Sequence, residues 1–185
     1  MLLRLDVETH AHHRPADRPW LNLMVTGVTR AVYAEQLGRA YAFEAPFEAA
    51  LAHTPHAVAL IGVRTRSRLL AQDLARLDYP LAKHGPRLIA PFATAPEALG
   101  WLYAVERSTR LLAKVRANIT SRVPDAPVTY VTDPGAEQRW RELEGVLERV
   151  ARSPRVADQI IHAAHDAFRC LHDWYLREEP LRRGA

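Results

Sequence analysis

The chain has 185 residues, of which 48% are hydrophobic and 25% are charged. This length and apolar content suit one domain with a single sizeable core, and they exclude disordered, collagen-like and small disulfide-stabilised proteins. Cys170 is the only cysteine, so the sequence excludes an intramolecular disulfide and a cysteine-based zinc finger. The expected setting is therefore the reducing cytoplasm.

The charge balance points weakly to anionic partners. Lysine and arginine number 25 against 21 acidic residues, for a net charge of +4, and the two signs are interleaved along the chain. Such a pattern does not predict a nucleic-acid partner. Asp6 and Glu8 come too early for a secretory signal, and no run of about 18 apolar residues follows, so we expect no membrane partner.

Helical periodicity runs through most of the sequence. Apolar residues at spacings of three and four predict an all-α single domain over residues 1–185, with five or six helices. Pro46 is expected to kink one of them, and the turn-rich connection from Pro124 to Gly135 is expected to be extended at Val128 to Val131. The predicted helices cover Thr29 to Leu51, Arg64 to Leu77, Ala95 to about Ile119, Glu137 to Arg152 and Pro154 to about Leu176.

Histidine is the residue type that stands out chemically, because the common hydrolase, zinc-protease and nucleotide-binding motifs are absent from the sequence. On the last predicted helix, His162 and Asp166 are four residues apart and so could share a metal ion. The simpler interpretation of that face is a solvated polar surface. No Glu-x-x-His pair occurs on another predicted helix to complete a dinuclear site.

A second group of histidines lies near the start of the chain. His10 and His13 are three residues apart and share a helix face, so one of them could turn its imidazole inward as a ligand for iron. The alternative is an ordinary hydrogen-bonded histidine on the surface or in the core.

Two segments in the first third of the chain are similar to the first two helices of a known protein family. Thr9 to His13, followed by Asp17, is similar to the first-helix pattern T-x-x-x-H-x-x-x-[ED] of heme oxygenases. The helix predicted from Thr29 to Leu51 looks like their second helix, with Tyr33 near its start and Pro46-Phe47-Glu48 near its end.

Two later segments extend this similarity in the same order. Leu70 to Leu74 resembles the family's L-x-x-D-L segment, and Ala98 to Tyr103 resembles its A-L-G-W-L-Y segment. The four segments extend from Thr9 to Tyr103 and follow one another in the family's order. The sequence therefore resembles the heme oxygenase family of the bacterial biliverdin-producing type, which implies a heme oxygenase-like helical bundle.

The resemblance also implies a reaction and its cofactor. Heme would be cleaved with O2 and electrons from a reductase to biliverdin, iron and carbon monoxide. His13 would be the axial ligand of the heme iron, with His10 or His12 as the fallback, and Arg14 or Arg18 would meet the heme propionates. Ser108 on the distal helix would be the catalytic side chain.

The distal segment departs from the family pattern. Where bacterial members have E-G-S-T-L-G-G, this chain has Glu106 to Leu112, with Arg107, Leu111 and Leu112 in place of the three glycines. These three side chains would line or border the heme position, where glycine allows close approach of the backbone. Pro15 is a second departure, and it is expected to end the first helix early.

Three functions are compatible with the sequence. The first is an active heme oxygenase with an altered pocket. The second is a catalytically degenerate member that serves as a non-enzymatic module for a tetrapyrrole or a partner protein. The third is a non-heme metal oxidase on the same fold, carried by His162 and Asp166.

Overall fold

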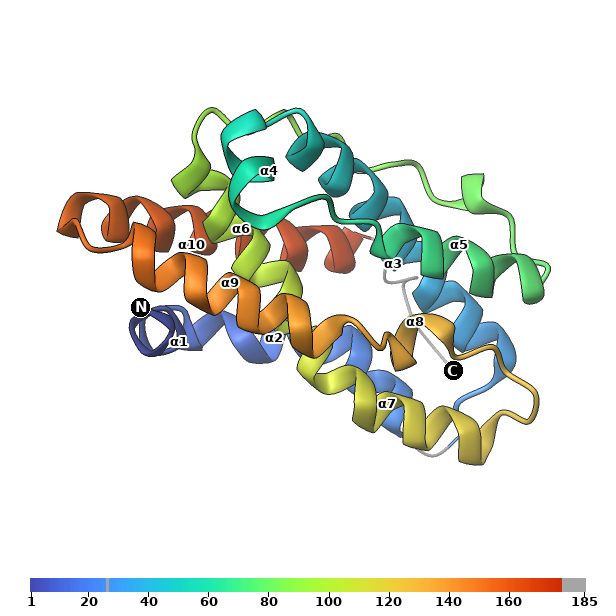
Figure 1. Ribbon diagram of the computed structural model, residues 1–185. Coiled ribbons are helices and arrows are strands. Elements are labelled where there is room, and N and C mark those ends of the chain that lie inside the picture. Colours follow the sequence, from blue (N-terminus) through green and yellow to red (C-terminus); the bar gives the residue numbers. More distant parts are fainter. Residues whose placement is uncertain (26, 178–185) are drawn as a thin grey trace.

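The computed structural model describes residues 1–25 and 27–177, and in these two ranges every regular element is a helix (Figure 1). The prediction of an all-α single domain is confirmed. No helix in the same ranges is both long and apolar enough to cross a bilayer. The α-helices are α1 (Leu2–Glu8), α2 (His10–Leu21), α3 (Arg30–Ala52), α4 (Pro55–Ile61), α5 (Arg66–Arg76), α6 (Ala95–Arg107), α7 (Thr109–Arg122), α8 (Thr129–Thr132), α9 (Ala136–Val150) and α10 (Pro154–Arg177), with 3-10 turns η1 (Asn22–Met24) and η2 (Leu81–Lys83).

Threonine side chains cap the N-termini of α3 and α6. The Thr29 hydroxyl accepts a hydrogen bond from the Val32 amide at 3.2 Å, and the Thr94 hydroxyl accepts one from the Glu97 amide at 3.3 Å. These bonds satisfy amides that have no partner within their helices. The first of these helices, α3, includes Pro46, so this proline does not end it.

The N-terminal helix differs from its prediction. It does not end at Pro15, because α2 includes both Pro15 and Pro19 and reaches Leu21. The break comes earlier, at Thr9, between α1 and α2. Pro15 is the sixth residue of α2, so it removes one backbone hydrogen bond of the helix but does not end it.

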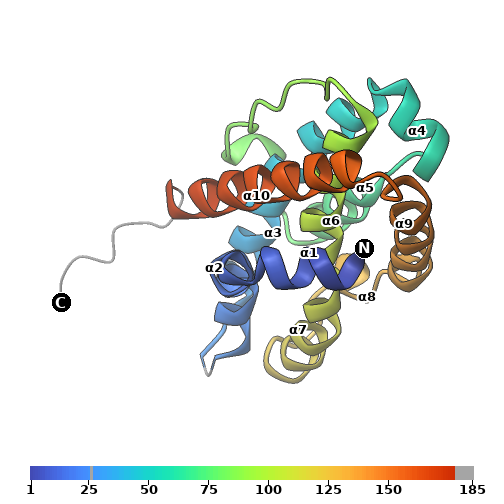
Figure 2. The ribbon, with the colours of Figure 1, turned by 90° about the vertical axis from the view of Figure 1, so that its left-hand side faces the viewer.

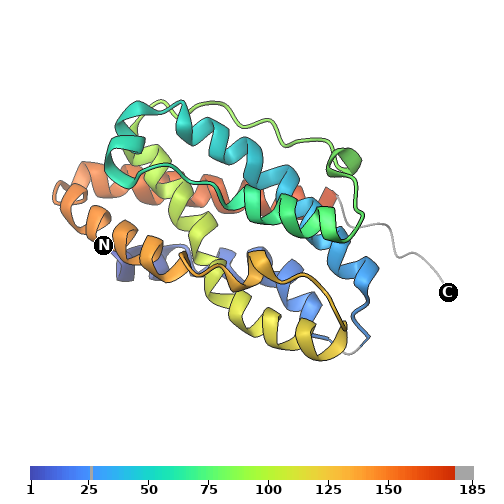
Figure 3. The ribbon, with the colours of Figure 1, turned by 45° about the vertical axis from the view of Figure 1, so that its right-hand side comes forward.

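The predicted helix from Ala95 to Ile119 is divided in two at Ser108. Figure 3 shows α6 and α7 as two successive helices whose axes point in different directions. The Ser108 hydroxyl donates to the Val105 carbonyl at 2.8 Å, and the Thr109 hydroxyl donates to the Glu106 carbonyl at 2.6 Å. Hydroxyl groups that bind carbonyls in this way compete with the helical ladder.

The connection from Pro124 to Gly135 contains a helix instead of the extended stretch expected at Val128 to Val131. The Asp73 carboxylate of α5 accepts hydrogen bonds from the amides of Thr129 and Tyr130, at 3.1 and 2.8 Å. This carboxylate caps α8 from a distant part of the chain, which overrides the β-favouring local sequence.

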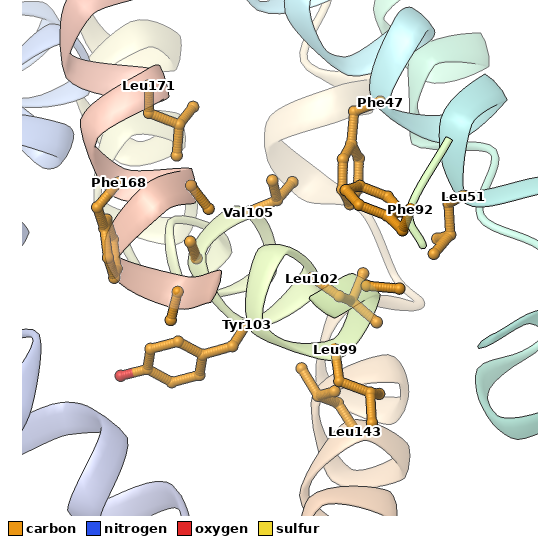
Figure 4. Packing of buried hydrophobic residues seen from close by; sticks show 14 of the residues in the cluster. Phe47, Leu51, Phe92, Leu99, Leu102, Tyr103, Val105, Leu143, Phe168 and Leu171 are labelled. Carbon is orange, nitrogen blue, oxygen red and sulfur yellow. The ribbon is translucent and has the colours of Figure 1, made fainter. Parts of the chain in front are cut away.

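The core is organised around α6 and α10, which approach each other closely at Gly100. A Cβ atom at Gly100 would lie 2.7 Å from the Cβ of Ala163, which real structures do not tolerate. Figure 4 shows α6 sending Leu99, Leu102 and Val105 into the cluster shared with α3, α9 and α10. A second cluster packs α2, α3, α5 and α7 around Trp20 and Tyr130.

Helices α1 and α2 lie beside α10 on one face of the molecule (Figure 2). The N-terminal histidines are therefore next to the histidines of the last helix. This face carries both of the histidine groups that the sequence identifies.

Candidate ligand-binding site

The space between α2 and the end of α6, where the resemblance would place heme, is nearly filled by side chains. A cavity of about 20 Å³ remains, which has room for about one water molecule. Its lining residues come from α2, α3, α6 and α10 and include Ser108; they are Ala16, Asp17, Trp20, Phe43, Glu44, Ala104, Val105, Ser108, Phe168, Leu171 and Tyr175.

An ion pair joins the two helices across this space. The Nη1 nitrogen of Arg107 lies 2.9 and 3.0 Å from the two carboxylate oxygens of Asp17. Burial raises the pKa of Asp17, and the nearby Arg107 guanidinium opposes that rise. Arg107 therefore ties the end of α6 to α2 at a point where the heme oxygenases have a glycine.

His13 is buried, and its Nε2 nitrogen is already bonded. This nitrogen lies 2.9 Å from the Thr9 hydroxyl, whose own proton goes to the Leu5 carbonyl at 2.7 Å. Because the hydroxyl has one proton, His13 must be the donor of the bond between them. Burial, with the positive charge of Arg107, lowers the pKa of His13 to about 4, so the imidazole is neutral at neutral pH.

The two fallback histidines have different surroundings. His10 is exposed and packs edge-on against His13, with ring centroids 5.4 Å apart. The Nε2 of His12 is hydrogen-bonded to the Nδ1 of His165 on α10 at 3.0 Å, and its ring stacks on Phe168. Burial, and to a smaller extent His165, lowers the pKa of His12. Among the described residues, none of His10, His12 and His13 lines the 20 Å³ cavity.

The distal leucines do not face the cavity either. Leu112 is buried in the second core cluster, with Trp20 and Tyr130, whereas Leu111 is partly exposed. Of the four predicted distal residues, Ser108 lines the cavity, and Arg107 pairs with Asp17, which also lines it. Leu111 and Leu112 do not line it.

The proposed metal pair on α10 is a surface feature. His162 Nε2 lies 3.6 Å from a carboxylate oxygen of Asp166, the His162 side chain is 78% exposed, and Asp166 also pairs with Arg169. Within residues 1–25 and 27–177, no three histidine, cysteine or acidic side chains are grouped so that they could hold a metal ion. This geometry agrees with the solvated polar face that the sequence also allowed.

A buried ionic network, which the sequence analysis missed, borders the cavity through Glu44. The Arg66 guanidinium lies 3.4 Å from Glu44, 3.6 Å from Asp133 and 4.0 Å from Glu106, and it donates to the Tyr130 hydroxyl at 2.6 Å. Burial raises the pKa of Glu44 to about 7, although Arg66 opposes the rise. No local sequence signal marks these residues, because they come from four separate segments.

The larger opening lies on the outer side of α2, against the last turns of α10. It is a groove of about 450 Å³. Its polar lining includes Arg14 and Arg18, which the resemblance assigned to the heme propionates, and His172 of α10. Tyr175, which is buried, contributes to the lining of both the groove and the 20 Å³ cavity.

No protein-family model matches the chain, and a search of the curated proteins finds no significant match.

Proposed function

We propose that this chain is a non-enzymatic tetrapyrrole-binding module on a heme oxygenase-like fold. The observation that carries the proposal is the Arg107–Asp17 ion pair, which ties α2 to α6 and leaves 20 Å³ between them. Ligand pockets for small molecules have volumes of about 300–1,000 Å³. An interior of this size supports no enclosed heme, whereas the outer groove of about 450 Å³ is in the right range.

The state of His13 supports the same proposal. Its Nε2 donates to Thr9, so coordination of iron through that nitrogen would need the bond to break and the proton to leave. Heme cleavage at the interior site would also need α2 and α6 to separate around the Arg107–Asp17 pair. Such a separation would break an ion pair that is mostly buried in the structure.

The test is hemin titration followed by a turnover assay. We expect hemin to change its Soret absorption on binding to the wild-type protein and to a His13→Ala variant alike. We expect no bilin absorption when a reductase and O2 are then supplied. Formation of a bilin by the wild-type protein would instead establish the heme oxygenase reaction, and a lack of any hemin binding would remove the tetrapyrrole from the proposal.

A further inference from the structure

We propose that His12 of α2 and His165 of α10 form a two-histidine site for a divalent transition-metal ion of the Cu²⁺ and Ni²⁺ class. The ion would join two helices that lie side by side on the face shown in Figure 2. Neither histidine is among the described residues that line the 20 Å³ cavity or the groove. The metal site therefore goes beyond the proposed function and does not depend on it.

The two ring nitrogens already lie at the separation that one metal ion requires. Nε2 of His12 is 3.0 Å from Nδ1 of His165. Imidazole nitrogens bind such ions at about 2.0–2.1 Å, so two of them are about 2.9 Å apart at a right angle around the ion and about 3.3 Å apart at a tetrahedral angle. The observed distance is close to the right-angled arrangement, which is typical of tetragonal Cu²⁺ and Ni²⁺ sites.

The packing of α2 against α10 orders both rings. The His12 ring stacks on Phe168, with an angle of 6° between the planes. The His12 and His165 rings meet edge-on, with centroids 5.1 Å apart. Phe168 is buried in the main core cluster, so it gives the His12 ring a fixed support. Side chains that are already ordered lose little conformational freedom when they bind an ion.

Ion binding needs a free lone pair on both nitrogens. In the hydrogen bond between the two rings, one nitrogen carries a hydrogen and the other accepts it. This hydrogen moves, by exchange with solvent, to the second nitrogen of its own ring. Each ring then tilts to direct its lone pair at the ion. Both imidazoles stay neutral, so the ion replaces one shared hydrogen without a net release of protons.

Solvent supplies the remaining ligands of the ion. Both histidines are partly exposed, so water can reach the site. Arg169 lies one turn after His165, and its guanidinium pairs with Asp166, which offsets the positive charge. Structural metal sites usually have four protein ligands, so a site with two histidines and water is expected to bind its ion reversibly.

The probe for the test is Ni²⁺ alone, titrated calorimetrically at neutral pH into the wild-type chain and into His12→Gln and His165→Gln. Glutamine is chosen because its amide can still form a hydrogen bond with the remaining histidine, which helps to preserve the fold. The matched control is His162→Gln, one turn earlier on α10, where the side chain is 78% exposed. Mg²⁺, which prefers oxygen ligands, is the control ion. Thermal unfolding with and without Ni²⁺ is the second measurement.

We expect the wild type and His162→Gln to bind one Ni²⁺ with the same affinity and to unfold at a higher temperature in its presence. His12→Gln and His165→Gln should each bind it at least about tenfold more weakly, since even the loss of an outer-shell partner of a metal ligand costs this much. Neither should be stabilised at a Ni²⁺ concentration that stabilises the wild type.

Three results would overturn the site. The first is no Ni²⁺ binding by the wild type, or equal binding by all four proteins. The second is a loss of binding in His162→Gln as large as in the other two variants, which would place the ion on the surface of α10. The third is equal affinity for Mg²⁺, which would exclude imidazole ligands. Each of these results leaves the tetrapyrrole proposal standing, because the hemin titration tests that proposal separately.

Discussion

The Nε2–H of His13 donates to the hydroxyl of Thr9 at 2.9 Å, across the junction between α1 and α2. The Thr9-to-His13 spacing resembles a heme-ligand pattern, and in this structure the same spacing places the two side chains one turn apart and bonds them to each other. Burial, with the positive charge of Arg107, keeps this imidazole neutral at neutral pH. Its protonation state links the fold to pH.

Acid should destabilise the protein through His13. The pKa of His13 is about 4 in the folded state, below the ordinary value of 6.5, so the unfolded chain binds the proton more tightly. The contribution of neutral His13 to the free energy of unfolding is complete above about pH 6.5 and is lost as the pH falls towards 4. Between pH 7 and pH 4.5 the wild type should lose about 2–3 kcal/mol more than a His13→Gln variant. Urea denaturation at both pH values measures the difference, and identical losses would show that His13 does not titrate as described.

Removal of the Thr9 hydroxyl should leave a buried donor without a partner. Thr9→Val keeps the shape of the side chain but removes the acceptor of the His13 bond, at a cost of about 1–3 kcal/mol in unfolding free energy. Thr9→Ser retains the hydroxyl and is the matched control, expected to lose less. Chemical denaturation at pH 7 distinguishes the two variants; equal losses would mean that the methyl group, and not the hydrogen bond, matters at this position.

Glycines in the distal segment should weaken the fold and open the interior. The triple variant Arg107→Gly/Leu111→Gly/Leu112→Gly removes the ion pair with Asp17 and the buried Leu112 side chain. Each glycine costs about 1 kcal/mol of helix stability, and the lost leucine adds roughly 2–5 kcal/mol. Hemin should recover part of this loss by binding the folded state. Thermal unfolding with and without hemin measures the recovery.

The comparison for this variant is its His13→Ala derivative. If the interior has opened, the added substitution should abolish the gain in hemin binding that the glycines provide. If the glycine variant binds hemin no better than the wild type does, the distal side chains do not control access to the interior.

Arg66 and Glu44, two members of the buried ionic network, should contribute unequally to the free energy of unfolding. Arg66→Met would leave Glu44, Glu106 and Asp133 without their shared guanidinium, and breaking a buried pair in this way costs about 3–5 kcal/mol. Glu44→Gln should cost much less, because a carboxyl with a pKa of about 7 is already half-protonated at neutral pH. Denaturant titration of both variants at pH 7 is the measurement. A loss for Glu44→Gln as large as that for Arg66→Met would contradict the described pKa.

The crossing of α6 and α10 should not accept a methyl group. Gly100→Ala would force its Cβ against Ala163 and the Ile160 carbonyl, so we expect a loss of about 1–3 kcal/mol. Gly145→Ala on α9 is the control. Its Cβ would meet only the end of the Arg149 side chain, at 3.4 Å, so the higher helix propensity of alanine should raise stability by up to about 1 kcal/mol. Thermal unfolding should therefore change in opposite directions for the two variants.

Local apolar spacing in the sequence predicts the long helices. It does not predict an element whose formation depends on a contact with a distant segment. Apolar spacing and the Thr29 cap were sufficient to predict α3, and the same spacing predicted α9 and α10. The helix at Thr129 to Thr132 was missed because the carboxylate that caps it belongs to Asp73, far away in the sequence.

The candidate site follows the same rule. Arg14 and Arg18 were identified from one helix and do line the groove, but His172 and Tyr175 join them only because α10 lies against α2. The pairing of Arg107 with Asp17 depends likewise on how two helices meet. A resemblance to known motifs identified both residues without indicating that they contact each other.

Tyr175 is the one residue described as lining both the groove and the cavity. A smaller side chain at this position would therefore enlarge the space on the surface side and, at the same time, the interior space that reaches Ser108. Residue 175 is thus the position at which a single change in side-chain size acts on both spaces.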